Sequence, residues 1–518
     1  MYETIIESPH SALYNMFLYT GFIMMKAVVW LNIVELVVFI IYLICMIGIG
    51  LFFFIRSKGS GEKDYFLGGR KMGPWVSALS AGASDMSAWV LMGLPASVYA
   101  LGLGQVWIAV GLAIGYALSW IFEAPRLRSF SIAANDSITI PQYLTNRFKS
   151  KSHALQVTCA LIFLIAYTIY AASSIKAAGT LFNTVLGIDS HVAMYIAAAI
   201  IVGYTFLGGF NAVCWTDFFQ GMLMLGALLL APIFAATQLS GTNTVNIAKE
   251  VPNYFSPFAS WQDIVSGLGW GLGYFGMPHI IIRFMSVESQ KSLKRSAKIG
   301  VAWTTLILIF AVMVGVIGRM YLGFDEGVSN NSLVFITMVR KLFPSVLSGI
   351  LLSAILAASM STADSQLLSA ASSFSSDVYK PLIRKNKATN EEMIWNSRLV
   401  VLIVALLALV LAIDPGAGSI MDLVSNAWGV FGAAFGPVIL LSLFWKRLNF
   451  TGALVGIICG AAVDILWLIF LAGTGVYEIV PGFIAGTVAA VVVSLSTKAP
   501  SKEVEELFDQ GVNFKELD

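Results

Sequence analysis

The sequence predicts an all-α integral membrane protein with about thirteen transmembrane helices, and three observations lead to this fold class. The chain has 518 residues, of which 58% are hydrophobic and only 12% charged, and its mean hydropathy is +0.82. Apolar stretches of roughly 20 residues, the length that crosses the hydrocarbon core of a bilayer, follow one another almost from end to end. Glycine, proline and charged residues lie mainly in the short joints between them, which leaves no room for a separate soluble domain.

The individual helices are assigned from these apolar stretches. An N-terminal extension, residues 1–32, has no basic segment and therefore lacks the features of a secretory signal peptide. An additional first helix at 33–55 follows it, and two peripheral helices at 451–496 precede a tail at 497–518. The helices are expected at 33–55, 74–98, 103–123, 154–175, 189–210, 214–238, 262–285, 298–320, 346–376, 396–413, 419–444, 451–473 and 477–496.

Lysine and arginine are concentrated in every second connection between these helices. Short cytoplasmic loops retain positive charge, so the basic connections are expected to face the cytoplasm. An odd number of spans then places the N-terminus outside and the C-terminus in the cytoplasm of a multi-pass protein of the cell (plasma) membrane, in contact with the lipid bilayer. The basic connections lie at 56–71, 126–151, 291–298, 380–387 and 446–447.

Cysteine and histidine give no sign of a metal or haem centre. The four cysteines lie in or beside apolar stretches without a paired spacing, and the four histidines are scattered over distant segments. The intramembrane acids stand among hydroxyl groups and glycines instead of clustered catalytic groups, so we expect no enzymatic activity. With a net charge of only +2, we expect no nucleic-acid partner, and no obligatory protein partner is evident.

One acidic residue stands in the middle of an apolar segment. Asp85 lies within 78–93 among small and hydroxyl-bearing residues. An aspartate at the centre of a transmembrane helix costs about 2.5 to 3.5 kcal/mol on insertion scales, so such a residue normally pairs, faces water or belongs to an ion or substrate path. We therefore interpret this segment as half of a site for a cation and a solute.

A second segment, 267–278, is too rich in glycine for a regular helix. It has glycine at 267, 269, 271, 273 and 276 and ends in Pro278. Each glycine costs about 1 kcal/mol relative to alanine in a helix, and an interior proline about 3. Irregular backbone is tolerated at membrane depth only where it is buried in protein or lines a cavity. We expect an unwound joint from which Trp270 and Tyr274 project; the alternative is a glycine-mediated helix contact.

A third segment, 353–368, places small and hydroxyl-bearing residues on one helical face. Ala358, Ser361, Thr362 and Ser365 have the spacing i, i+3, i+4 and i+7. Hydroxyl and loosened carbonyl oxygens suit a hard cation such as sodium. The alternative is a stripe of small residues that packs against a neighbouring helix.

The two interrupted segments begin corresponding blocks of five helices, at 74–238 and 262–444. Discontinuous helices at matching positions of two repeats point to a transporter binding site at the midplane of the membrane. Five spans separate the two starts, an odd number, so the second block inserts with the opposite orientation. This parity is what two inverted repeats require.

At these positions the chain resembles the sodium/solute symporter family, most closely its proline-transporting branch. The resemblance extends from about residue 33 to 498. Four motifs carry it in order and spacing: GGRKMGPWVSALSAGASDMSAW at 68–89, WTDFFQ at 215–220, GWGLGYFGMPH at 269–279 and MSTADSQ at 360–366.

The resemblance implies a leucine-transporter-type core of two inverted five-helix repeats, a 5+5 arrangement, with a sodium ion between its first and eighth helices. Backbone carbonyls of Ala83, Met86 and Ala358 and the hydroxyls of Ser361 and Thr362 are the implied ligands, and Asp85 would recruit the ion. Asp217 resembles a carboxylate that serves cation release or a second cation site, which Asp364 and Ser365 would complete. The alternative for Asp217 is a structural pairing with a neighbouring group.

The same resemblance implies sodium-coupled symport of L-proline into the cell by alternating access. Aromatic walls suit the compact apolar pyrrolidine ring, while its charged groups need a few placed polar groups or helix ends. The implied pocket and path consist of Ser87, Trp89, Gly93, Tyr170, Trp270, Tyr274 and Pro278.

Three positions near this path depart from the family pattern, so the solute is less well determined than transport itself. Proline transporters commonly have glycine where Ala88 stands, some have glutamine where Met277 stands, and an aromatic residue is frequent where Asn426 stands. A sodium symporter for another small carboxylate or vitamin, such as pantothenate or a monocarboxylate, is the alternative. A membrane sensor is a third class, but only about twenty residues follow the last predicted span.

Overall fold

The computed structural model describes residues 33–53, 55–56, 61–207, 209–239, 247, 250–258, 260–323 and 330–514. The predicted N-terminal extension and the last four residues of the tail lie outside these described residues. Within them the chain is all-helical, and the only β-pairing is an isolated bridge between Met72 and Val287. Ten helical stretches of the described residues are long and apolar enough to cross a membrane. This agrees with the predicted all-α membrane class, although it is three fewer than the thirteen expected spans.

The helices are, in chain order, Ile33–Phe53, α2 (Glu62–Leu67), α3 (Pro74–Asp85), α4 (Gly93–Leu101), α5 (Val106–Leu118), α6 (Ala124–Ala133), α7 (Ile140–Arg147), α8 (Ala154–Leu186), α9 (Ser190–Leu207), α10 (Phe210–Thr237), α12 (Trp261–Trp270), α13 (Pro278–Ser286), α14 (Gln290–Leu322), α15 (Val334–Leu342), α16 (Ser345–Ser373), α17 (Asn390–Ile413), α18 (Ile420–Phe444), α19 (Phe450–Phe470), α20 (Ile479–Ser496) and α21 (Lys502–Val512).

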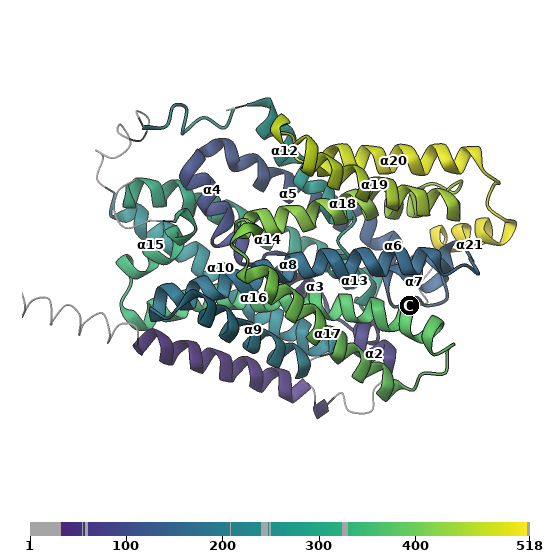
Figure 1. Ribbon diagram of the computed structural model, residues 1–518, viewed down its shortest axis with the longest axis horizontal. Coiled ribbons are helices and arrows are strands. Elements are labelled where there is room, and N and C mark those ends of the chain that lie inside the picture. Colours follow the sequence, from purple (N-terminus) through teal and green to yellow (C-terminus); the bar gives the residue numbers. More distant parts are fainter. Residues whose placement is uncertain are drawn as a thin grey trace, which may run out of the picture.

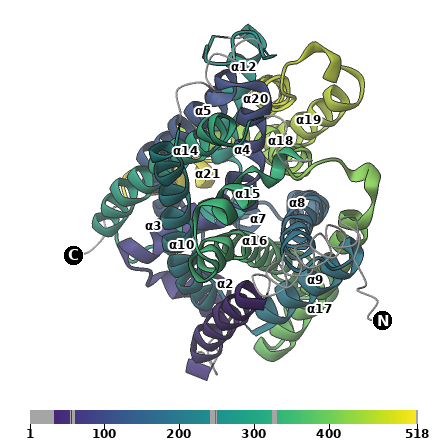
Figure 2. The ribbon, with the colours of Figure 1, turned by 90° about the vertical axis from the view of Figure 1, so that its left-hand side faces the viewer.

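The long helices run roughly along the long axis of the molecule, with short connecting helices at both ends (Figure 1). Helices α2, α7 and α21 lie at one end and α15 at the other. Figure 2 looks along the bundle and shows the helix 33–53 at one edge and the hairpin of α19 and α20 at another. Helix α16 lies inside, where it contacts α3, α8 and α10.

The segment predicted as a helix at 74–98 is broken in the middle. Helix α3 ends at Asp85, because Met86 leaves the helical region with φ −74° and ψ 69°, and Ser87 is extended. The Ser87 hydroxyl accepts a hydrogen bond from the backbone N–H of Trp89 at 3.4 Å. After a single 3-10 turn, α4 begins at Gly93.

The glycine-rich segment is broken at the corresponding place. Helix α12 ends at Trp270, a 3-10 turn covers Gly271–Phe275, and α13 starts with Pro278 at its first position, where a missing N–H costs nothing. The glycines also permit close packing on α5, since a Cβ on Gly271 would lie 2.3 Å from the carbonyl oxygen of Gly111. Both interpretations of the glycine run therefore hold: it unwinds the helix and forms a tight contact.

Several helices extend beyond their predicted bounds. Helix α8 continues to Leu186 where we expected an end near residue 175, and α14 already begins at Gln290 instead of residue 298. Both additions carry polar residues that hydropathy alone excludes from a span. They lie beyond the apolar stretch, where a helix can continue without facing lipid.

Candidate cation and solute site

The Asp85 carboxylate joins the two broken segments. It is fully buried at the end of α3, and the hydroxyl of Tyr274, from the break after α12, donates a hydrogen bond to its Oδ2. The other oxygen, Oδ1, has no hydrogen-bond partner among the described residues. A buried polar atom without a partner is costly, so this oxygen can accept a cation or a donor group.

The backbone carbonyl of Asp85 is the centre of a second set of contacts. It accepts hydrogen bonds from the Ser87 N–H at 2.8 Å, from Trp89 Nε1 at 3.1 Å and from the Tyr170 hydroxyl at 3.4 Å. Three residues predicted to contact the solute, two from the break and one from α8, thus surround one peptide group.

Aromatic rings form a wall beside this centre. Trp89 and Trp270 have ring centroids 6.3 Å apart, and Tyr274 packs edge-on against Trp428 at 5.1 Å. Trp428, on α18, also donates from Nε1 to the carbonyl oxygen of Trp270 at 2.8 Å. The wall is apolar and aromatic on one side and polar at Asp85, which suits a small solute that is partly apolar.

Gly93 and Pro278 hold the ends of the two breaks. A Cβ on Gly93 would lie 3.3 Å from the sulfur of Met421 and 3.3 Å from the Cβ of Trp89, so a larger residue would press on the aromatic wall. Pro278 is buried as the first residue of α13.

The predicted sodium ligands of α3 and α16 meet. Ser361 Oγ lies 2.8 Å from the carbonyl oxygen of Ala83 and 3.3 Å from that of Ala358. The hydroxyl of Thr362 is buried and has no hydrogen-bond partner within the described part of the chain. Met86 directly follows α3, at the point where the backbone leaves the helical region. Oxygen atoms of this kind are the ligands that a hard cation takes.

The residues expected at a second cation site surround an arginine. Asp217 Oδ2 lies 3.1 Å from Arg283 Nη2, and the same nitrogen donates to Ser365 Oγ at 2.6 Å. Ser365 Oγ lies 3.3 Å from Asp364 Oδ1. The structure thus brings the three predicted residues together around one guanidinium group.

Arg283 does not occupy every carboxylate oxygen of this cluster. Two buried carboxylates face one guanidinium, and Asp217 Oδ1 and Asp364 Oδ2 have no hydrogen-bond partner among the described residues. Ser80 links the cluster to α3, because its hydroxyl donates to Asp217 Oδ2 at 2.7 Å. Sequence analysis missed Arg283, although an arginine within the apolar run 280–285 is itself a signal of a functional position.

The end of the site near α13 is closed. The N–H of Met72, just before α3, donates to the Ser286 carbonyl at 3.1 Å, and the N–H of Glu288 donates back to Met72 at 3.1 Å. Arg70 Nη1 donates to the Met285 carbonyl at 2.7 Å, and Arg128 Nε to that of Val287 at 2.8 Å. Backbone and side-chain hydrogen bonds therefore connect the N-terminal end of α3 to the C-terminal end of α13.

The other end has a cavity of about 320 Å³. It is lined by Ser97 of α4, Gln105 beside α5, Ser266 and Trp270 of α12, and Ser425 of α18, together with the loop between α19 and α20. Trp270 forms part of its wall and also belongs to the aromatic wall at Asp85. The cavity therefore leads toward the predicted solute pocket.

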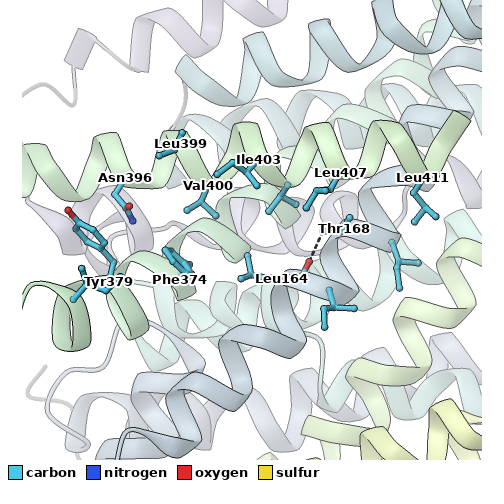
Figure 3. Close-up of a pocket in the computed structure, with 14 residues that line it drawn as sticks. Leu164, Thr168, Phe374, Tyr379, Asn396, Leu399, Val400, Ile403, Leu407 and Leu411 are labelled. Atoms are coloured by element: carbon cyan, nitrogen blue, oxygen red, sulfur yellow. Dashed lines mark hydrogen bonds between the residues drawn. The ribbon is translucent and has the colours of Figure 1, made fainter.

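A larger groove of about 720 Å³ lies between α8, α17 and the end of α16. Figure 3 shows Val400, Ile403 and Leu407 of α17 along one side, Leu164 and Thr168 of α8 along the other, and Tyr379 at one end. Its lining is almost entirely apolar, and Leu407 is 54% exposed at the surface. Such a groove offers a polar solute few partners, and it lies away from Asp85 and the two breaks, so we do not assign it as the solute site.

Comparison with known proteins agrees with this geometry. The model of the sodium:solute symporter family matches residues 65–460. The osmoregulated proline transporter OpuE of Bacillus subtilis is 44% identical over 90% of this chain and 96% of its own length. The high-affinity proline transporter PutP of the same organism is 44% identical over 88% and 97%, and the sodium/proline symporter of Escherichia coli is 43% identical over 92% and 96%.

Solved structures share the fold at lower identity. A Na⁺-coupled sialic acid symporter in a substrate-bound, outward-open state superposes with a TM-score of 0.76 at 23% identity, over 90% of this chain and 99% of that one. MhsT in complex with L-phenylalanine superposes with a TM-score of 0.54 at 15% identity, over 82% and 99%. These likenesses establish the fold and leave the solute to be argued from the site.

Proposed function

The chain belongs to the sodium:solute symporter family, and we propose that it carries L-proline into the cell together with sodium by alternating access across the plasma membrane. The observation that carries this proposal is the buried Asp85 carboxylate between two broken helices, with cation-type oxygens of α3 and α16 close by. Relatives that are named proline transporters align over about nine-tenths of the chain.

We propose a core of two inverted five-helix repeats, at 74–238 and 262–444. The additional helix at 33–55 precedes it and the peripheral pair at 451–496 follows it, with the tail at 497–518. Breaks at α3–α4 and α12–α13 open the two repeats at corresponding places, which supports this division. We propose that each broken pair and α9 also cross the membrane once, which with the ten long stretches would make thirteen spans. With this odd number the N-terminus would lie outside and the C-terminus in the cytoplasm.

Sodium is proposed to bind between α3 and α16. The carbonyls of Ala83, Met86 and Ala358 and the hydroxyls of Ser361 and Thr362 would hold it. The support is chemical, since hard cations take oxygen ligands and the Thr362 hydroxyl is buried without another partner among the described residues. Asp85 follows Ala83 by two residues and supplies the negative charge that favours a cation there.

A second cation is proposed at Asp217, Asp364 and Ser365. Two unpartnered carboxylate oxygens in that cluster support it, and the Arg283 guanidinium supplies only one of the positive charges that two carboxylates attract. The alternative role of Asp217 as a structural partner of Arg283 is compatible with the same contacts, because one oxygen of Asp217 faces Arg283 and the other is free within the described residues.

Proline is proposed to bind against the aromatic wall. Trp89, Trp270 and Tyr274 would enclose its ring, and Tyr170 and Ser87 would contribute hydroxyls near Asp85. Gly93 and Pro278 would shape the pocket at the two breaks. The pyrrolidine ring of proline matches the apolar side of this wall, while the carboxylate and ammonium groups of proline match the polar side.

Coupling requires that each ligand favour one conformation. A ligand shifts a two-state equilibrium only by its difference in affinity for the two states. Sodium held between α3 and α16 would fix the broken segment in the shape that presents Trp89 and the Asp85 carbonyl to the solute. The membrane potential then contributes about 2.3 kcal/mol per charge for each 100 mV, in addition to the sodium gradient.

Uptake into proteoliposomes under an imposed sodium gradient tests the proposal. Labelled proline should accumulate only when sodium is higher outside. A panel of other small carboxylates, with pantothenate and a monocarboxylate included, should compete poorly. Accumulation of one of these instead of proline would assign the same machinery to a different solute, and accumulation without a sodium gradient would remove the coupling.

A further inference from the structure

The loop between α19 and α20 covers the mouth of the solute pathway. These two helices lie outside the two proposed repeats, and Figure 1 shows their loop end beside α12. The loop supplies Ala472 and the four consecutive residues 475–478 to the lining of the 320 Å³ cavity that leads to Trp270. The hairpin is thus part of the pathway as well as a neighbour of the bundle.

Tyr477 makes the principal contacts of this loop. Its ring stacks on Trp270 with centroids 5.0 Å apart and an angle of 28°. Its hydroxyl donates to the carbonyl of Ser425 on α18 at 2.7 Å. Its N–H donates to the Ser266 hydroxyl on α12 at 3.0 Å, and that hydroxyl donates to the Gly475 carbonyl of the same loop at 3.1 Å.

These contacts connect two helices that border the pathway. The ring and the backbone N–H of Tyr477 contact α12, which carries Trp270 and precedes the second break. The hydroxyl of Tyr477 contacts α18, which carries Trp428. Trp270 is therefore packed between Trp89 on the inner side and Tyr477 on the outer side. Tyr477 is buried, so the stacked pair separates the inner wall from the cavity.

The hairpin that presents Tyr477 is held firmly on the bundle. Helices α19 and α20 pack on each other and on α18. A Cβ on Gly460 of α19 would lie only 2.1 Å from the Ala433 carbonyl of α18, so the helices approach as closely as their backbones allow. The loop therefore has a fixed support beside helices that must shift during transport.

From this geometry we propose that Tyr477 is the outer lid of the solute pathway, a specificity-determining residue contributed by the peripheral hairpin. The proposal rests on the proposed function, because it takes Trp270 as part of the solute pocket. When the solute is bound, the Tyr477 ring closes over Trp270 and the hydrogen bond to Ser425 holds the lid against α18. The lid acts on solute binding and leaves the sodium ligands of α3 and α16 untouched.

The first test compares three variants in sodium-driven uptake. Tyr477→Ala removes the stacked ring and should raise the solute half-saturation concentration about tenfold, a loss in line with an aromatic pair, with the sodium half-saturation unchanged. Tyr477→Phe keeps the ring and loses only the hydrogen bond to Ser425, so a rise of roughly two- to threefold is expected. Phe470→Ala, at an exposed position of the same hairpin, is the control and should behave as wild type.

The second test measures closure directly. Ser97→Cys places a thiol in the cavity, in a background where Cys45 and Cys459 are replaced by serine; the other two cysteines are buried. Sodium with proline should slow its reaction with an impermeant thiol reagent when Tyr477 is present, and should no longer do so in Tyr477→Ala. If the alanine variant does not reach the membrane, Tyr477→Phe carries both measurements.

The outcomes separate the lid from the transport assignment. A wild-type protein that fails to accumulate proline overturns the proposed function. A wild-type protein that transports proline, combined with unchanged half-saturation and unchanged protection in the Tyr477 variants, overturns the lid alone. Equal changes in the sodium and solute half-saturation would also overturn it, since they would indicate a general structural role.

Discussion

Arg283 Nη2 lies 3.1 Å from Asp217 Oδ2, and both side chains are buried inside the helix bundle. Breaking such a pair by removing one partner costs about 3–5 kcal/mol, because it leaves the other charge buried and uncompensated. We expect Arg283→Gln to lower the thermal stability of the purified protein strongly, and the double variant Arg283→Gln/Asp217→Asn to recover part of the loss. Thermal unfolding in detergent measures both.

The Lys446–Asp509 pair is the matched control for this experiment. It has a similar separation of 2.7 Å, but its side chains are 41% and 54% exposed. Exposed pairs contribute only about 0–1 kcal/mol, so Lys446→Gln should leave the unfolding temperature nearly unchanged. Equal effects of Lys446→Gln and Arg283→Gln would contradict the internal ion pair as a stabilising element.

Asp85→Asn separates the charge of this residue from its hydrogen bond. An asparagine oxygen can still accept the hydrogen bond from Tyr274, but it carries no charge to favour a cation beside Ala83. A unit charge a few ångströms away is worth a few kcal/mol at the effective dielectric constant near 20 that suits proteins. We therefore expect the sodium half-saturation of uptake to rise at least about tenfold.

Tyr274→Phe is the companion to this variant, since it removes the hydrogen bond and keeps the Asp85 charge. It should change solute affinity more than sodium affinity. Sodium titrations of proline uptake in vesicles measure both quantities. Normal sodium dependence in Asp85→Asn would rule out an electrostatic role for Asp85 in sodium binding.

Composition predicted the two breaks and spacing predicted the hydroxyl-bearing face of α16, and both have local causes. A carboxylate at Asp85 and five glycines before Pro278 cannot continue a regular lipid-facing helix, and both segments are broken at these places. Residues at i, i+3 and i+4 share a helical face, so spacing predicted that Ala358, Ser361 and Thr362 lie together on one side of α16. The contact of Ser361 with Ala83 of α3 was expected only from the family resemblance.

The pairs that depend on the packing of distant segments could not be predicted. Arg283 meets Asp217 only because α13 and α10 both pack on α3, where Ser80 contacts both side chains. Tyr477 meets Trp270 only because a loop outside the proposed repeats folds over α12. Neither contact leaves a periodic pattern in the sequence. Helix bounds such as the end of α8 differed because polar residues can extend a helix beyond the apolar stretch.

Ser361 and Thr362 are expected to contribute differently to sodium binding and to folding. Ser361 donates to the carbonyls of Ala83 and Ala358, so Ser361→Ala removes a proposed sodium ligand and also a contact between α3 and α16. The Thr362 hydroxyl has no such partner within the described residues. Thr362→Val preserves the shape of the side chain and should raise the sodium half-saturation with little loss of stability.

Isothermal titration with sodium and thermal unfolding, carried out on the same preparations, distinguish the two effects. Ser361→Ala should lower the unfolding temperature without sodium, by the roughly 1 kcal/mol of a typical hydrogen bond, whereas Thr362→Val should change only the stabilisation that sodium adds. Ser359→Ala, a buried neighbour whose hydroxyl also lacks a partner in the described part of the chain, is the control. Unchanged sodium binding in Thr362→Val would exclude its hydroxyl as a ligand.

Arg70 holds the closed end of the site through four groups. It donates to the carbonyls of Met285 and Ser137, to the hydroxyl of Ser131 and to the Asp136 carboxylate. Burial lowers the pKa of Arg70, and the neighbouring Asp136 carboxylate acts against that shift. A lysine has a single donor atom and cannot reproduce this fork of contacts.

We therefore expect Arg70→Lys and Arg70→Gln to loosen the hydrogen bonds between Met72 and the residues around Val287. Hydrogen exchange of peptides that contain the amides of Met72 and Glu288 measures this opening. A decrease of about 1.4 kcal/mol in the free energy of local opening corresponds to about tenfold faster exchange. Lys63→Gln is the matched control, because Lys63 contacts the same Asp136 from an exposed position and donates no hydrogen bond to Met285 or Val287 among the described residues. Faster exchange in Lys63→Gln, or protected amides in Arg70→Gln, would place the control of this end elsewhere, in Arg128 or in the backbone bridge itself.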